Sequence, residues 1–375
     1  MEQKIIYQIL IDRFSGNITS EKNDNHFMGG NLAGIIGHLD YIKELGFNTI
    51  LLSPFLQSTS YHGYHTENFY EVDSHFGTIN DVQNLIRESH IRNIKLMFDF
   101  VPNHCSYKHP FFVDAIKNPH SPYKNWFYIS SPTFYRSFLQ HRELPKFNLN
   151  NPDTANYIIK TCQYWLSLGF DYVRIDHTIG VPFAFLSRLV QESKQQNSKI
   201  SFIGEVWGQR IPRRYFHTIY LKHLWRNYLF GINQENLQKD YIGILDGVFD
   251  FEFTNLIVSA ILQGEKCMGN KKLQQKVDQH FSRYPADFDL VLMLDNHDMN
   301  RFLYYCKGDS NKLLDAIRFI KEQHRSFSIY YGTENKMMNT KDIFDKTAYA
   351  DLRVREVFQL SAPILYKEIS SILKR

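Results

Sequence analysis

The chain has 375 residues, enough for one large barrel or two ordinary domains. Its hydrophobic share of 43% and charged share of 22% are typical of a folded soluble protein, and its formal net charge of +4 is small. Apart from a short run at Arg210–Arg214, no basic cluster is interleaved with aromatic residues, so we expect no nucleic-acid partner.

Apolar runs of strand length recur along the chain, and most are followed by helical periodicity. The predicted strands are 5–11, 48–55, 94–101, 170–176, 199–207, 247–253, 289–298 and 326–332. The predicted helices are 30–46, 78–93, 151–169, 181–197, 313–325 and 362–375. In the first of them six apolar residues form one stripe, and Gly46 is predicted to end the helix: Leu32, Ile35, Ile36, Leu39, Ile42 and Leu45.

Eight strands, most of them paired with helices, predict an α/β fold of the (β/α)8 TIM-barrel type. The continuous apolar strands indicate burial on both faces, as in a parallel sheet. A doubly wound open sheet is the alternative, but no glycine-rich dinucleotide turn supports it.

One connection is much longer than the others. Between His104 and about Asn151 the chain is rich in Pro, His and aromatic residues and has little periodicity. Loops of this length are usually functional or form small subdomains. We therefore predict a short excursion at 105–150 after the third strand, with the barrel made of 1–104 and 151–375.

Polar side chains end four of the predicted strands, where a barrel of this type builds its active site. They are Asp99, Asn103 and His104; Arg174 and Asp176; Glu205; and His297, Asp298 and Arg301. Each one alone is explained equally well as a helix cap or a satisfied core histidine. Together they indicate a site, because capping does not require Arg174 beside Asp176 or His297 beside Asp298.

The chemistry that fits this set is cleavage of a glycosidic bond with retention, which needs two carboxyl groups roughly 5–5.5 Å apart. Arg174 and Asp176 are two residues apart on a strand and point the same way, so the cation would keep a nucleophilic Asp176 ionised. The proton donor should lie away from that cation on a more apolar wall, and Glu205, followed by Val206, fits. Asp298, His104 and His297 could hold sugar hydroxyls.

Four stretches, FDFVPNH, VRIDHT, IGEVW and LDNHD, resemble in order and spacing the conserved regions of glycoside hydrolase family 13, the α-amylase superfamily. HGYHTENFYEVDSHFGT and SIYYGTEN resemble further family segments, and LPKFNLNNPDT is most similar to the neopullulanase and cyclomaltodextrinase form. The resemblance extends from Tyr7 to about Arg353. It implies a nucleophile, an acid/base and a third acid at Asp176, Glu205 and Asp298. It also implies substrate contacts at Tyr64, His104, Arg174, His297 and Arg301, and a mostly structural acid at Asp99.

The sequence departs from this family in several places. Ile179 and Gly180 stand where many starch-cleaving members have a Lys-His pair, which makes long-chain α-amylase specificity doubtful. His65 and Asn68 replace common acids. The chain stops after the predicted eighth helix, so we expect no C-terminal β-sandwich domain and no N-terminal sugar-binding module.

No cofactor is required for this chemistry, and the remaining question is a structural calcium ion. Asn103 matches a family calcium ligand, and residues of the first loop lie where some relatives bind calcium: Asn17, Asn23, Asp24 and Asn31. Calcium prefers several anionic oxygens, and only Asp24 is charged. We therefore expect no metal, with calcium as the alternative.

The expected substrates are maltooligosaccharides or related α-glucans, and hydrolysis and transglycosylation both remain open. A metal-dependent barrel hydrolase would use histidines such as His62, His65 and His177, but it would want an HxH pair where the first strand has Ile11, Asp12 and Arg13. A non-catalytic sugar-binding barrel is the third possibility, and the retention of all three acids argues against it.

The remaining features concern location and assembly. The four cysteines show no paired spacing, the apolar N-terminal run is too short for a signal peptide, and no segment is long enough to span a membrane. We expect a cytoplasmic protein without a membrane partner. A monomer or a homodimer is possible, the latter because the last helix region is rich in apolar residues: Leu360, Ile364, Leu365, Ile369, Ile372 and Leu373.

Overall fold

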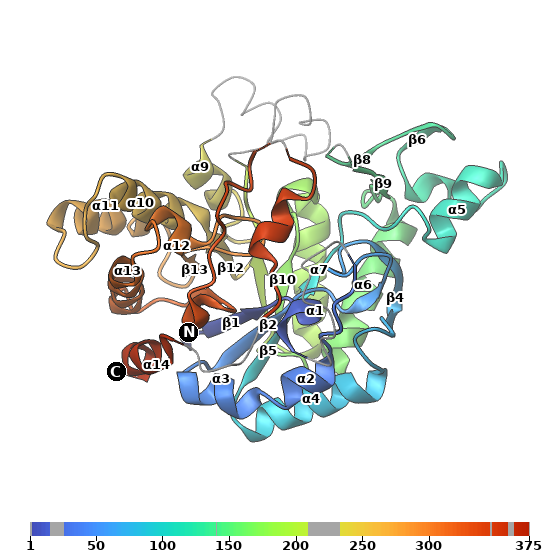
Figure 1. Ribbon diagram of the computed structural model, residues 1–375. Helices are drawn as coiled ribbons and strands as arrows, with labels where there is room; N and C mark the ends of the chain where they lie inside the picture. Colours follow the sequence, from blue (N-terminus) through green and yellow to red (C-terminus); the bar gives the residue numbers. More distant parts are fainter. Residues whose placement is uncertain are drawn as a thin grey trace. The chain divides into compact units, whose positions relative to one another are not determined.

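Eight parallel strands form a closed barrel in the part of the chain that the computed structural model describes, residues 2–15, 26–139, 141–208, 233–345, 347–358 and 364–374 (Figure 1). The strands follow one another around the barrel in chain order. They are β1 Ile5–Ile9, β2 Thr49–Leu52, β5 Lys95–Phe100, β10 Tyr172–Ile175, β11 Ser201–Gly204, β12 Gly247–Asp250, β13 Asp289–Met293 and β14 Phe327–Tyr330. The predicted (β/α)8 fold is confirmed. All but two of these strand residues, Lys95 and Ser201, are buried, as expected for a sheet covered on both faces.

By its internal contacts the chain divides into two units. The first unit comprises Met1–Ser53, His75–Met97 and Phe249–Arg375, and the second comprises Pro54–Ser74 and Phe98–Val248.

In the first unit, β1 pairs with β2 and with β14, and β13 pairs with β14. Its helices are α1 Ile11–Phe14, α2 Leu32–Ile36, α3 Leu39–Leu45, α4 Ile79–Ile91, α10 Phe251–Leu262, α11 Lys271–Phe281, α12 Phe302–Tyr305, α13 Ser310–Glu322, α14 Tyr366–Lys374 and the 3₁₀ turns η4 Thr333–Asn335 and η5 Ala350–Val354. Helix α4 begins at a capping box formed by Thr78 and Asp81.

Two predictions for this unit are wrong in detail. The single helix expected over 30–46 is two helices, α2 and α3, because the chain turns at Gly37, a poor helix former. The strand expected over 247–253 ends at Asp250, whose side chain accepts a hydrogen bond from the Phe253 N–H and so begins α10. The predicted stop at Gly46 is correct: its φ of 111° is left-handed, and a Cβ there would lie 2.8 Å from the Leu373 Cβ.

Most of the apolar residues near the C-terminus belong to the core of this unit. Leu365, Ile369, Ile372 and Leu373 are buried, and α14 packs on α3 and α13. Ile364 is exposed, and Leu360 lies outside the described residues. Core packing therefore accounts for most of the stripe on which the homodimer prediction rested.

In the second unit, β10 pairs with β11, and β11 with the start of β12. Its other elements are β3 Leu56–Ser58, β4 Thr66–Val72, α5 Pro110–Lys117, η1 Lys124–Trp126, β6 Ile129–Ser131, β7 Phe134–Tyr135, β8 Ser137–Phe138, β9 His141–Pro145, α6 Pro152–Ser167, η2 Thr178–Gly180, α7 Phe183–Gln196 and α9 Gln234–Lys239. The predicted excursion 105–150 holds α5, η1 and the two hairpins β6–β7 and β8–β9.

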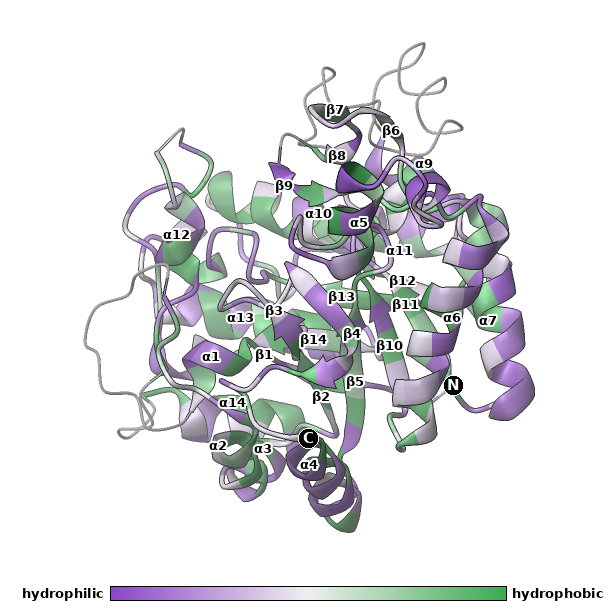
Figure 2. Cartoon of the chain, turned by 90° about the vertical axis from the view of Figure 1, so that its right-hand side faces the viewer, coloured by the Kyte–Doolittle hydropathy of each residue, from purple (hydrophilic) through white to green (hydrophobic). Residues whose placement is uncertain are grey.

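The longer helices carry both hydrophobic and hydrophilic residues, as their periodicity predicts. Figure 2 shows both kinds along α4 in the first unit and along α7 in the second. The buried face of α7 includes Phe185, Leu186 and Leu189. Across the described residues, no helix combines the length and the apolar character needed to cross a membrane.

Candidate active site

The second unit gathers three carboxyl groups around the guanidinium of Arg174. Nη1 of Arg174, on β10, donates to the two oxygens of Asp99 at 2.6 and 2.5 Å and to Asp176 Oδ1 at 3.2 Å. Its Nη2 lies 2.6 Å from Glu205 Oε1. Asp99 is on β5, and Asp176 and Glu205 directly follow β10 and β11, so three strands supply the cluster. Arg174 and Asp176 point the same way, as strand alternation predicts.

The charges in this cluster depend on one another. Burial alone would lower the pKa of Arg174, but the charges of Asp99, Glu205 and Asp176 raise it well above its usual range. The four side chains are 10% exposed or less. Removing the cation would leave buried carboxylates without compensation, which is strongly destabilising.

The expectation that Glu205 lies away from the cation is wrong. Its Oε1 contacts Arg174, and its Oε2 accepts a hydrogen bond of 2.9 Å from the His177 N–H. Val206, the apolar residue that follows it, is fully buried. Each of the two Glu205 oxygens therefore already accepts from one donor in this structure. Catalytic contacts of this kind often settle only when substrate is bound.

The backbone at His177 is strained. His177 has φ 41° and ψ 48°, in the left-handed region that residues other than glycine rarely adopt. This conformation aims its N–H at Glu205. Strain of this kind is tolerated where the surrounding structure fixes it, often at functional sites.

Tyr64 and His104 lie in the same unit. The Tyr64 hydroxyl donates to Asp99 Oδ2 at 2.8 Å, which ties it to the Arg174 cluster. The His104 ring lies 4.8 Å from the ring of Phe138, which in turn meets the ring of His177 edge-on at 4.6 Å. Burial lowers the pKa of His104 to about 3, with smaller contributions from His65 and Lys146, so its imidazole is neutral.

A chain of hydrogen bonds sets the tautomer of His104. Lys146 Nζ donates to Asn103 Oδ1 at 2.8 Å, which fixes the orientation of that amide. Asn103 Nδ2 then faces His104 Nδ1 at 3.2 Å. Because the amide nitrogen can only donate, Nδ1 accepts and Nε2 carries the proton. This Nε2 atom is itself buried.

The first unit holds the third predicted acid. Asp298 follows β13, and its Oδ2 lies 3.0 Å from His297 Nε2. Nδ1 of His297 lies 3.0 Å from the side-chain amide nitrogen of Gln8, on β1. Arg355 donates from Nη2 to Asp298 Oδ1 at 2.7 Å and from Nε to the His297 carbonyl at 3.1 Å, and Asp351 pairs with it at 2.6 Å.

Arg301 is placed differently from the other predicted substrate contacts. It is 1% exposed, and its guanidinium lies 4.1 Å above the Tyr330 ring and 5.1 Å from that of Tyr331. Its Nη1 donates to the Tyr331 carbonyl at 2.5 Å. These contacts are those of a core cation, so they give no support to a substrate-contacting role for Arg301.

Four residues of these clusters were not singled out from the sequence: Gln8, Phe138, Lys146 and Arg355. Phe138 and Arg355 lie in segments without helical or strand periodicity, so nothing local marked them. Lys146 lies in LPKFNLNNPDT, where the buried lysine could have been noticed beside Asn103. Gln8 is the one polar residue in the apolar run of β1, which was a signal.

The described donor set around Asn103 does not fit calcium. The Asn103 Oδ1 and the Gly180 carbonyl both accept hydrogen bonds from Lys146 Nζ, at 2.8 and 2.5 Å. The side-chain nitrogen of Lys146 thus occupies the oxygens that a calcium ion would need. Asn31 Oδ1 caps α2 by accepting from the Gly34 N–H, while Asn17, Asn23 and Asp24 lie outside the described residues, as does Arg210–Arg214. Within the described ranges, no three His, Cys, Asp or Glu side chains are grouped to hold a metal.

Known proteins of similar sequence belong to one enzyme family. The family described as "Alpha amylase, catalytic domain" matches residues 8–361. Alpha-amylase 2 of Dictyoglomus thermophilum is 33% identical over 349 residues, which make up 92% of this chain and 57% of that protein. The intracellular maltogenic amylase of Bacillus subtilis is 27% identical over 354 residues, 89% of this chain and 55% of that protein.

The fold has a close counterpart among solved structures. A cyclomaltodextrinase superposes with a TM-score of 0.83 at 25% identity, covering 99% of this chain and 62% of its own. The chain therefore spans less than two thirds of the length of these relatives.

Proposed function

Because the chain belongs to the α-amylase catalytic-domain family, we propose that it is a retaining glycoside hydrolase that cleaves α-glucosidic bonds in maltooligosaccharides or related α-glucans. The observation that carries this proposal is the contact of one guanidinium, that of Arg174, with both Asp176 and Glu205. A shared cation keeps the two carboxyl groups close, and retention requires them roughly 5–5.5 Å apart.

In the first step Asp176 is the nucleophile. A carboxylate oxygen of Asp176 attacks the anomeric carbon while Glu205 gives its proton to the departing glycosidic oxygen. This forms a glycosyl ester on Asp176 and releases the leaving part of the glucan as an alcohol. In the second step Glu205 takes a proton from water, the resulting hydroxide attacks the anomeric carbon, and Asp176 leaves as a carboxylate.

The other residues act on the sugar. His104, with its proton on Nε2, donates a hydrogen bond to a hydroxyl of the distorted ring, and Tyr64 offers an aromatic face. In the first unit Asp298 is the third acid, and it accepts hydrogen bonds from sugar hydroxyls with oxygens that His297 and Arg355 position. Arg301 lies in the core against Tyr330 and Tyr331. No cofactor is needed for these steps.

The substrate and the compartment are finer points of the proposal. The names of the relatives include an amylase, a maltogenic amylase and a cyclomaltodextrinase, which supports short or cyclic α-glucans as substrates. The four cysteines are free and buried, which together with a relative named intracellular supports a cytoplasmic enzyme. A sugar hydroxyl could replace water in the second step, which would make the enzyme a transglycosylase.

NMR of freshly formed product tests the mechanism. Two displacements at the anomeric carbon retain its configuration, so the α-anomer should appear first from maltoheptaose. An initial β-anomer would show inversion and would exclude a covalent role for Asp176. Product profiles from maltoheptaose, pullulan and a cyclodextrin then identify the substrate and the ratio of hydrolysis to transfer.

A further inference from the structure

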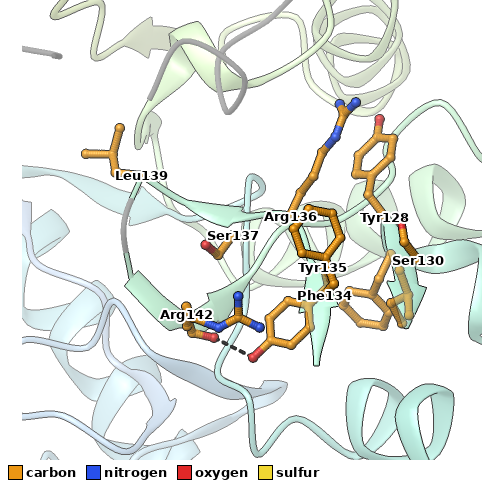
Figure 3. A pocket seen from close by; sticks show the side chains of 10 residues that line it. Tyr128, Ser130, Phe134, Tyr135, Arg136, Ser137, Leu139 and Arg142 are labelled. Atoms are coloured by element: carbon orange, nitrogen blue, oxygen red, sulfur yellow. Dashed lines mark hydrogen bonds between the residues drawn. The ribbon is translucent and has the colours of Figure 1, made fainter. Parts of the chain in front are cut away.

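A hollow of about 610 Å³ lies at the hairpins β6–β7 and β8–β9 of the second unit (Figure 3). This volume lies within the range of ordinary ligand sites. Its lining is aromatic and cationic, with Tyr128, Phe134, Tyr135, Arg136 and Arg142 as its large side chains. No function assigned so far to the Arg174 cluster or to Asp298 uses these residues.

Phe134 offers an aromatic face to solvent. Phe134 is on the short strand β7 and is 68% exposed. Exposed apolar surface with polar residues around it often marks a binding site. An aromatic ring of this kind stacks on the C–H face of a pyranose, which is the least polar surface that a sugar has.

The two arginines are held flat over tyrosine rings. The Arg136 Cζ lies 4.8 Å from the Tyr128 ring centre, and the Arg142 Cζ lies 4.7 Å from that of Tyr135. Arg142 gives one N–H to the Thr133 carbonyl, and its own carbonyl accepts from the Tyr135 hydroxyl at 2.9 Å, the bond drawn in Figure 3. Stacking fixes the guanidinium groups and leaves further N–H donors at their edges.

The charge of the hollow narrows the ligand class. None of its lining residues is acidic, and within the described ranges neither Arg136 nor Arg142 forms an ion pair with a carboxylate. Figure 3 shows the two guanidinium groups apart from each other, each on its own ring, rather than converging on one point. This arrangement suits an uncharged ligand whose acceptors are spread along a chain better than one compact anion.

Strand β8 connects the hollow to two histidines of the second unit, His104 and His177. Ser137 lines the hollow, and the next residue, Phe138, contacts the rings of His104 and His177. We propose that the hollow is an auxiliary binding site for an α-glucan chain. The choice of ligand rests on the proposed function, whereas the presence of a site rests on the lining alone.

The test measures glucan binding separately from cleavage. Native gels containing soluble amylose are run with the Asp176→Asn protein, so that glucan is not consumed, and with Phe134→Ala added to it. We expect the added change to weaken binding about tenfold, the upper range for loss of one aromatic contact. Tyr107→Ala, at another exposed aromatic residue (48% exposed) outside the hollow, is the matched control and should bind unchanged.

Kinetics provide the second arm. With Asp176 intact, Phe134→Ala should raise the KM for a long glucan about tenfold and leave kcat/KM for a short chromogenic α-maltoside unchanged. Equal binding of amylose by the Phe134→Ala protein and its parent would overturn the auxiliary site. Displacement by inorganic phosphate but not by maltoheptaose, with loss of binding in Arg136→Ala, would overturn it in favour of an anion site.

The two proposals fail in different ways. A wild-type protein that binds amylose through Phe134 but cleaves no α-glucoside would contradict the proposed function and retain the site. Cleavage with the α-anomer first, together with unchanged binding in Phe134→Ala, would retain the function and remove the site.

Discussion

The two units hold their candidate catalytic acids in different ways. In the second unit one strand-borne cation, Arg174, contacts Asp99, Asp176 and Glu205, and all four side chains are 10% exposed or less. In the first unit Asp298 has a side chain that is 32% exposed, and its partner Arg355 comes from a segment outside the strands. A buried cluster on neighbouring strands is fixed by the barrel itself, whereas the Asp298 group depends on a segment that must be positioned separately.

One histidine in each unit has the same hydrogen-bonding arrangement at its Nδ1 atom. His104 and His297 each have a side-chain amide nitrogen at Nδ1, from Asn103 at 3.2 Å and from Gln8 at 3.0 Å. Both arrangements put the proton on Nε2. They differ in support, because Lys146 fixes the Asn103 amide by occupying its oxygen. The predictions below separate the buried cluster from the more exposed one, beginning with the largest expected effect.

Glu205→Gln should abolish cleavage of maltooligosaccharides, with kcat reduced about 10⁴-fold, because an amide cannot donate the proton that the leaving group needs. The first step should survive for substrates with a very good leaving group, since these depart without protonation. Burst kinetics with a chromogenic α-maltoside measure that step. Wild-type rates on maltooligosaccharides would show that Glu205 is not the proton donor.

Arg174→Lys and Arg355→Lys test the comparison directly. Lysine keeps the charge but cannot reach several carboxylates with one planar group, so Arg174→Lys should lower kcat about 10³-fold in a folded protein, with a smaller change in KM. Arg355→Lys should cost only about tenfold in kcat/KM, since its pair with Asp298 is partly exposed and water can replace part of it. Circular dichroism checks the fold of both. Equal losses of kcat/KM in the two variants would remove the distinction between the buried Arg174 cluster and the more exposed Asp298 group.

The sequence predicted the barrel and the buried cluster for the same physical reason. Continuous apolar strands can only be buried on both faces, and their polar ends then lie on one rim, so Asp99, Arg174, Asp176 and Glu205 could be assigned together. Alternation along β10 predicted even the common direction of Arg174 and Asp176. The assumption that failed was electrostatic: Glu205 contacts the cation that it was expected to avoid.

What could not be predicted depends on long-range placement. Arg355 and Phe138 lie in segments without periodicity, and their partners are set by the folded chain and not by neighbours in sequence. The helix over 30–46 broke at Gly37, and the run GVFDFEF became a strand followed by a helix, because the Asp250 cap outweighs the alternating pattern after it. In both cases a local polar or backbone preference overrode the apolar period.

Gln8→Leu tests the histidine of the first unit. Without the amide at Nδ1, the tautomer of His297 would depend on the contact of its Nε2 with Asp298, and kcat/KM should fall roughly tenfold, the cost of about one misplaced hydrogen bond. Nitrogen-15 NMR of the ring distinguishes the tautomers independently of activity. Gln8→Glu is the informative companion: a carboxylate favours a proton on Nδ1, so the pH–rate profile should shift. Unchanged ring nitrogen shifts in both variants would mean that Gln8 only fills space.

The smallest expected effect contrasts two buried lysines. In the first unit Lys4 pairs with the carboxylate of Asp289 at 2.8 Å, whereas in the second unit Lys146 donates to two neutral oxygens, those of Asn103 and Gly180. Burial, with a smaller contribution from Arg136, lowers the pKa of Lys146 to about 7. The neutral amine still has two N–H groups for the two oxygens, so deprotonation keeps both hydrogen bonds.

The lowered pKa of Lys146 makes the free energy of unfolding depend on pH in one direction. Between pH 7 and about 10.4, the usual lysine pKa, the unfolded chain holds a proton that the folded chain lacks, so the free energy of unfolding rises with pH, by at most about 1.4 kcal/mol per pH unit. Below pH 7 both states are protonated and the slope vanishes.

Lys146→Met removes this titration, so the wild-type minus variant difference in the free energy of unfolding should grow between pH 7 and 9 in urea titrations. Lys108→Met, at an exposed lysine, should show no such trend. A difference between wild type and Lys146→Met that stays constant with pH would mean that Lys146 remains charged in the folded protein, with Asn103 and Gly180 acting as ligands of an ammonium ion throughout this range.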